Sequence, residues 1–201
     1  MQYQHTNHHP CTKAMNTSFS SKHHDIVNSV ETWLERAVIG LNLCPFARAV
    51  HVRKQIRYVV SEATEPDQLV QALIEELNYL RRCEPKQTDT TLLIHPWILN
   101  DFLEYNEFLG IAEAILENMG LEGEIQIASF HPDYQFADAK RDDITNFTNR
   151  SPYPILHLLR EASIDKAVAA VPDTDAIYKR NIATLKKLGH EGWLSLFKSD
   201  E

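Results

Sequence analysis

The sequence predicts an α/β protein with a small, mainly parallel sheet of three to four strands, covered by helices and followed by C-terminal helices. Segments with a helical period alternate with short apolar segments that are typical of strands. This alternation favours parallel strands joined by right-handed crossovers. The run DTTLLIHP is apolar and bounded by polar residues, as buried strands are. A ferredoxin-like α+β fold is the alternative, because HVRKQIRYVV has room for a hairpin turn at residues 53–55.

Composition limits the class of protein and its partners. A hydrophobic content of 43% and a charged content of 24% are ordinary for a soluble globular protein. The sequence contains neither an apolar run near the roughly 18 residues of a membrane span nor a signal peptide, so we expect a cytoplasmic protein. The net charge of −8 argues against nucleic acid or anionic membrane as a partner. The oligomeric state stays open.

The chain divides into a tail and one domain. Residues 1–22 are polar, rich in histidine and without a period, so we predict a disordered tail and a single globular domain over residues 23–201. The three cysteines lack the paired spacing of a zinc or disulfide framework, which favours reduced thiols.

The first half of the domain contains two predicted helices and two predicted strands. Residues 23–39 have apolar positions at helical spacing, with Gly40 as the cap. Residues 50–63 are rich in β-branched residues and predict a strand ending near Ser61. Thr64 begins a second helix with leucines at 69, 73, 77 and 80, and residues 89–96 form the second strand.

The second half contains a long loop between its helices. Asn100 or Asp101 caps a third helix that ends at Gly120, and GEIQIASFHP is the third strand. More than twenty residues without a period follow, and loops of this length are usually functional or disordered. A helix is then predicted from Ser151 through Glu161. A last helix is capped by Asp173 and pauses at Gly189.

Two of the predicted strands end in the same dipeptide, His-Pro. His95 follows the second strand and His131 the third. In a parallel sheet both would reach the carboxyl edge, where open α/β folds bind ligands. His157 and Glu161 are four residues apart, so on the predicted helix they share one face and form a ligand pair or an oriented base. Convergence of His95, His131 and His157 would suit Zn, Fe or Cu. The alternative is that these histidines are hydrogen-bonded caps or solvated residues.

The segment NFTNRSPYP predicts an anion site at the start of the helix that opens near Ser151. The unsatisfied amides and positive dipole of a helix N-terminus attract anions. Asn149, Arg150, Ser151 and Tyr153 would bind the substrate. The alternative is that Ser151 or Asn149 only caps the helix. Cys44 precedes Pro45 near Arg48 and is either a thiolate nucleophile, a haem ligand or a buried inert cysteine.

Four segments resemble a bacterial family catalogued as domain of unknown function 1415. These are GLNLCPFARAV, TTLLIHP, SFHPDYQFAD and NFTNRSPYPILHLLREAS, and the resemblance covers about residues 25–198. It implies that Cys44, His95, His131, Arg150 and His157 are typical of the family. It supplies no mechanism.

The leading functional prediction is an enzyme that acts on a small anionic molecule. Its cofactor stays open, and a transition metal or haem is one option. Its catalytic residues would be His131, His157, Glu161 and Cys44, and its metal ligands His95, His131 and His157. One alternative is a metal-free thiol enzyme that uses Cys44 with His131. Another is a non-catalytic protein that binds a metabolite or haem.

Overall fold

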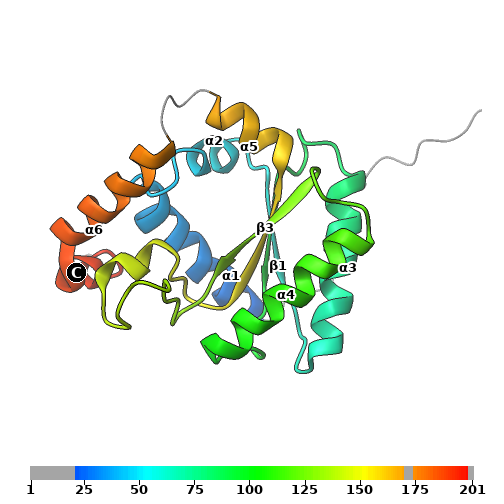
Figure 1. Cartoon of the computed structure of the whole chain (residues 1–201), viewed down its shortest axis with the longest axis horizontal. Helices are drawn as coiled ribbons and strands as arrows, with labels where there is room; N and C mark the ends of the chain where they lie inside the picture. Colours follow the sequence, from blue (N-terminus) through cyan, green and yellow to red (C-terminus); the bar gives the residue numbers. More distant parts are fainter. Residues whose placement is uncertain (1–20, 170–173, 199–201) are drawn as a thin grey trace, which may run out of the picture.

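A computed structural model describes residues 21–169 and 174–198 (Figure 1). The predicted tail, residues 1–22, lies outside the described residues except for Ser21 and Lys22, which begin the first helix. The predicted cap Asp173 also lies outside them. The helices are α1 (Ser21–Trp33), η1 (Leu34–Ile39), α2 (Ala47–Val52), α3 (Pro66–Arg82), α4 (Phe102–Asn118), η2 (Ile144–Thr148), α5 (Glu161–Val168) and α6 (Thr174–Ser195). The strands are β1 (Ile56–Val60), β2 (Thr90–Ile94), β3 (Ile125–Phe130) and β4 (Ile155–Arg160).

The fold is α/β, as predicted, with one mixed sheet in the order β1-β2-β4-β3. The strand β1 pairs with β2 in parallel, whereas β4 lies antiparallel between β2 and β3. Three strands therefore point the same way, but two of the three bonded pairs are antiparallel, so the prediction of a mainly parallel sheet is wrong in this respect. The ferredoxin-like alternative does not form, because a short helix and a turn at Lys54 (φ 56°) precede β1 in place of a hairpin.

The strand β4 replaces the helix that the sequence predicted from Ser151 through Glu161. Apolar residues at 155, 158, 159 and 162 have helical spacing, yet β4 fills the position between β2 and β3. Its side chains are buried on both faces, Leu156 and Leu158 on one and Ile155 on the other. A strand enclosed in this way is apolar nearly throughout, and periodicity alone does not separate it from a helix.

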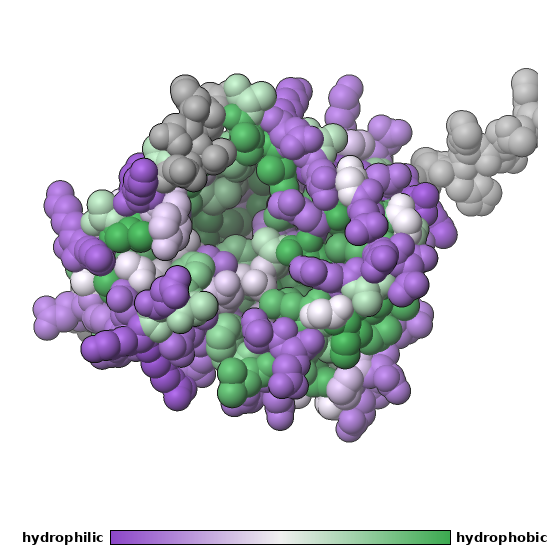
Figure 2. All heavy atoms as spheres, viewed as in Figure 1, coloured by the Kyte–Doolittle hydropathy of each residue, from purple (hydrophilic) through white to green (hydrophobic). Residues whose placement is uncertain are grey.

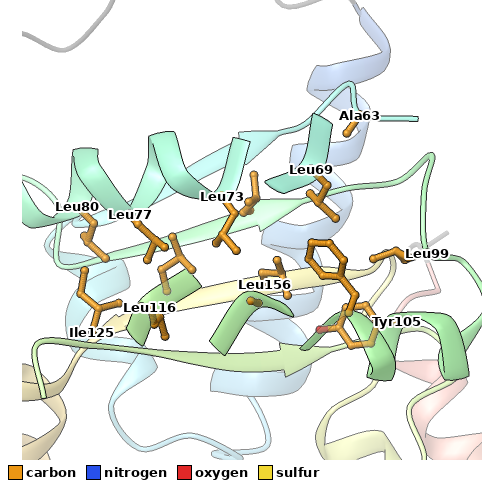
Figure 3. Packing of buried hydrophobic residues seen from close by; sticks show 14 of the residues in the cluster. Ala63, Leu69, Leu73, Leu77, Leu80, Leu99, Tyr105, Leu116, Ile125 and Leu156 are labelled. Carbon is orange, nitrogen blue, oxygen red and sulfur yellow. The ribbon is translucent and has the colours of Figure 1, made fainter. Parts of the chain in front are cut away.

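Helices α3 and α4 close one side of the sheet, which we call the closed side. Four leucines of α3 point towards the sheet and α4 (Figure 3), and each has a relative exposure of 0%. Pro66 opens α3 after a capping box between Glu65 and Gln68. Asp101 caps α4, as predicted, by accepting from the amides of Leu103 and Glu104. The four leucines are Leu69, Leu73, Leu77 and Leu80.

Helices α1, η1 and α6 lie on the other side of the sheet, which we call the open side (Figure 1). The predicted helix over residues 23–39 is confirmed as α1 and η1, although its last six residues form a π-helix. Gly40 keeps right-handed dihedrals, and a Cβ there would meet the Arg36 carbonyl oxygen at 2.2 Å. Glycine is therefore required at this position by close approach.

The start of the predicted strand over residues 50–63 is helical. Residues 47–52 form α2, and only Ile56–Val60 form β1. The pause predicted at Gly189 is confirmed, because Gly189 has φ 65° and ψ 177° inside α6. Within the described ranges, none of the helices combines the length and apolarity that crossing a membrane requires.

Candidate functional site

The histidines His95 and His131 lie at the same edge of the sheet, as predicted, because β2 and β3 both run antiparallel to β4. Both are fully buried beside Tyr105 of α4. The ring centroid of Tyr105 lies 5.8 Å from that of His95 and 5.0 Å from that of His131. The Tyr105 hydroxyl donates to the Ile155 carbonyl and accepts from the Phe130 amide, which ties α4 to β4 and β3.

The main chain occupies both ring nitrogens of His131. Its Nδ1 accepts from the amide of Asp133 at 3.0 Å, so the proton is on Nε2, which donates to the Leu99 carbonyl at 3.1 Å. In this arrangement the ring has no free lone pair for a metal or for a thiol of Cys44. Burial lowers the pKa of His131, which favours the neutral ring. With these two hydrogen bonds, the His131 side chain holds the start of the long loop in place.

His95 has one ring nitrogen without a partner. Its Nδ1 donates to the Ile98 carbonyl at 3.1 Å, which leaves a lone pair on a fully buried Nε2. Burial lowers the pKa of His95 to about 4. The ring is therefore neutral at pH 7 and shielded from solvent.

His157 lies on β4 and not on a helix, so its predicted pairing with Glu161 along one helical face is wrong. Glu161 is the first residue of α5. His157 is three residues along β4 from Pro154, whose carbonyl accepts from the His95 amide, and it points to the open side. Three residues of strand span about 10 Å. His157 is thus separated from His95 and His131, which pack on Tyr105 at the closed side.

Metal binding is not supported by this placement of the histidines. Across residues 21–169 and 174–198, no group of three or more His, Cys, Asp and Glu side chains is arranged to hold a metal ion. Direct ligation needs bonds of roughly 2.0–2.3 Å from several ligands at once. Metal or haem binding by His95, His131 and His157 stays a prediction.

Cys44 lies in the turn that follows η1 and packs against the hydrophobic cluster of the open side. Burial raises the pKa of its thiol, which is opposite to the depressed pKa that the sequence suggested. Its main-chain neighbours are fixed by α6, because Asn181 donates to the Leu43 carbonyl at 2.8 Å. A thiol with a raised pKa forms less thiolate and is a weaker nucleophile at neutral pH.

One pocket lies between α1, the long loop and the C-terminal end of α6, and its volume is about 680 Å³. This lies within the roughly 300–1,000 Å³ of small-molecule sites. Half of its lining is aromatic or proline. The lining residues are Asp25, Asn28, Ser29, Thr32, Trp33, Pro132, Phe147, Arg150, Ser151, Pro152, Trp193 and Phe197. We call this the Arg150 pocket.

Arg150 is the single cation among those lining residues, and its orientation is fixed. Its guanidinium carbon lies 4.5 Å from the centre of the Phe147 ring. Its Nε donates to the Tyr134 carbonyl at 3.2 Å and one Nη2 proton to the Arg141 carbonyl at 2.6 Å. Within the described part of the chain, three of its five N–H groups therefore remain available. Burial lowers the pKa of Arg150, but an arginine stays charged in proteins.

The helix predicted beside Arg150 does not exist, so the anion site differs from the one expected. Ser151 Oγ donates to the Tyr153 carbonyl at 2.6 Å, and Asn149 Nδ2 donates to the Ser129 carbonyl at 3.2 Å. Asn149 and Tyr153 are absent from the pocket lining, whereas Arg150 and Ser151 belong to it. Asn149 shapes the loop by accepting from the His131 amide through its carbonyl.

The sequence reasoning missed the aromatic walls of this pocket. Trp33 lies on α1 and Trp193 on α6, and the sequence indicated for both only that they pack against the rest of the domain. Phe147 of the long loop packs against α6, because its ring centroid lies 5.0 Å from that of Trp193. The density of aromatic residues in the long loop was the available signal, since pockets of this kind are lined by aromatic side chains with a few polar groups.

The fold and the pocket define the class: an α/β protein with a mixed four-stranded sheet and an aromatic pocket that contains one arginine. The chain belongs to a protein family of unknown function, DUF1415, which matches residues 25–195. The resemblance noted in the sequence is thereby confirmed. No curated protein and no solved structure matches the chain.

Proposed function

We propose that this protein binds a small anionic molecule with a flat apolar body in the Arg150 pocket. The observation that carries this proposal is the oriented guanidinium in an aromatic lining. Charge-assisted hydrogen bonds from arginine to carboxylate or phosphate are about twice as strong as neutral ones. The walls formed by Trp33, Phe147 and Trp193 would hold a ring beside the anion.

Binding is favoured over catalysis at this pocket. The predicted catalytic residues His131, His157, Glu161 and Cys44 are absent from its described lining. The lining offers Asp25 as a second charged group, and Asp25 is exposed at the start of α1. The free thiol of Cys44 suits a reducing compartment, so we propose a cytoplasmic location for this function.

The test is a titration with benzoate and with phenyl phosphate, monitored by tryptophan fluorescence. Two of the three tryptophans, Trp33 and Trp193, line the pocket, so Trp97→Phe removes the background signal. We expect saturable quenching by at least one probe. Because a hydrogen bond to a charged group is worth about 1.5–3 kcal/mol, Arg150→Gln should weaken binding by about tenfold or more.

The control is Arg141→Gln in the same loop. The Arg141 side chain is 78% exposed and pairs only loosely with Asp133 at 3.6 Å, so this variant should bind as the parent does. Arg150→Lys keeps the charge but loses the planar fork, and we expect an intermediate affinity. The proposal would be contradicted if neither probe quenched the fluorescence. It would also be contradicted if the Arg141 and Arg150 variants lost the same amount of binding affinity.

A further inference from the structure

His157 lies near the middle of β4 on the open side, among apolar neighbours. Its partners across the sheet are Leu92 on β2 and Ala128 on β3. The ring of Phe130 lies 6.0 Å away, centroid to centroid. His157, Ala128 and Phe130 are all half-buried, whereas Leu156 and Leu158 on the closed side of β4 are fully buried.

A hydrogen-bond chain fixes the tautomer of His157. The hydroxyl of Thr90 donates its one proton to the Leu158 carbonyl, at 2.6 Å. Towards His157 the same oxygen is therefore an acceptor, and Nε2–H donates to it at 2.7 Å. It follows that Nδ1 carries a lone pair and no proton.

The lone pair on Nδ1 of His157 is accessible, unlike those of the other two core histidines. No hydrogen bond to it exists within the described ranges, and Nδ1 is not among the buried polar atoms without a partner. His131 has both nitrogens engaged, and the unpaired nitrogen of His95 is sealed from solvent. Of these three rings, His157 is the one that offers an acceptor to an incoming molecule.

His157 is half-buried although β4 is an inner strand, so the helices of the open side leave part of its side chain uncovered. Surrounding protein lowers its pKa to about 4, although the side chain keeps some contact with solvent. On this side, α1 packs on β1 and α6 packs on η2. Figure 2 shows hydrophobic residues gathered in a hollow between the regions of α6 and α5. The α5 helix follows β4 directly.

We propose that His157, oriented by Thr90, is the acceptor of a second binding site, for a small neutral molecule with an apolar ring and one N–H or O–H group. A neutral imidazole in apolar surroundings does not attract anions, so this ligand class differs from that of the Arg150 pocket. The donor of the ligand would complete the hydrogen bonding of Nδ1, and the ring would pack against Ala128 and Phe130. The proposal is independent of the function proposed above.

The test compares phenol with toluene, which has the same size but lacks the donor. Titrations are followed by NMR of protein labelled with ¹⁵N in histidine, at pH 7. We expect the His157 spectrum of the free protein to show the Nε2–H tautomer, phenol to shift its Nδ1 signal, and phenol to bind about tenfold more tightly than toluene.

Two variants with different risks for folding complete the test. His157→Phe should abolish the preference for phenol, and Thr90→Val should leave a mixture of tautomers and reduce the preference. Arg150→Gln serves as the control and should change neither result. An Nδ1–H tautomer in the free protein, an unmoved Nδ1 signal with phenol, or a preference for phenol that persists in His157→Phe would overturn the proposal.

Discussion

The two sides of the sheet are built differently, although the same four strands form both. On the closed side, two helices of 17 residues each pack their apolar stripes on the sheet, and the leucines of α3 are fully buried. On the open side, the continuous helix α1 is joined by a π-helix, a 3₁₀ helix and a kinked α6. The irregular cover leaves the Arg150 pocket and the accessible face of His157. Regular packing thus gives stability on one side, and irregular packing on the other leaves the two sites that we propose for ligands.

The largest expected effect is the removal of a leucine from the closed side. Leu77→Ala deletes a side chain with 0% exposure, and we expect the free energy of unfolding to fall by about 2–5 kcal/mol. Leu188→Ala on the half-buried face of α6 should cost about 1 kcal/mol, because solvent already reaches that site. Urea unfolding measures both. Equal losses would remove the distinction between the two sides.

The second effect is a loss of folding stability in acid, which we expect from the buried His95. The pKa of His95 falls from 6.5 to about 4 on folding, so the unfolded chain binds the proton more tightly. The resulting stability is present above pH 6.5 and is lost as the pH falls from 6.5 towards 4. For His95 the loss amounts to about 3 kcal/mol. Urea unfolding at pH 7 and pH 4.5 tests this, and His95→Gln should show a smaller difference between the two pH values. An identical difference in that variant would contradict the assignment.

The smallest expected effect on stability comes from replacing one glycine on each side of the sheet by alanine. Gly40→Ala on the open side places a Cβ against the Arg36 carbonyl, and we expect a loss of about 1–3 kcal/mol. Gly110→Ala in α4 meets no atom within 4 Å and should stabilise the protein by about 0.5–1 kcal/mol. Thermal melting of both variants gives the sign directly. An unchanged melting temperature in Gly40→Ala would show that the backbone at the end of the π-helix shifts at little cost to accommodate the Cβ.

The closed side was the easier part to predict from sequence. The spacing of the α3 leucines, the cap at Asp101 and the apolar run of β2 each express a local rule, and each is confirmed. The segment that forms β4 obeyed a helical period as well, so only its place between β2 and β3 decides its structure. Local patterns do not contain that long-range information.

The candidate site was predictable only in part, for the same reason. Arg150 stands out in a polar loop, whereas Trp33 belongs to a helical stripe that predicts burial and Trp193 follows the pause at Gly189 as an apolar residue expected to pack. An apolar face of a helix either packs against another element or lines a pocket. Which of the two occurs depends on how the helices pack in three dimensions. The hydrogen bond between His157 and Thr90 joins residues 67 positions apart, and neither spacing nor composition indicates it.

The inner position of β4 in the sheet has a consequence for folding during synthesis on the ribosome. Within residues 21–169 and 174–198, the last strand to be synthesised is β4, which occupies an inner position and joins β2 to β3. Until residues 155–160 emerge, two strands have unpaired edges that other chains are able to pair with. We therefore expect a nascent chain halted before Ile155 to aggregate, and the completed sheet to form late, in one concerted step.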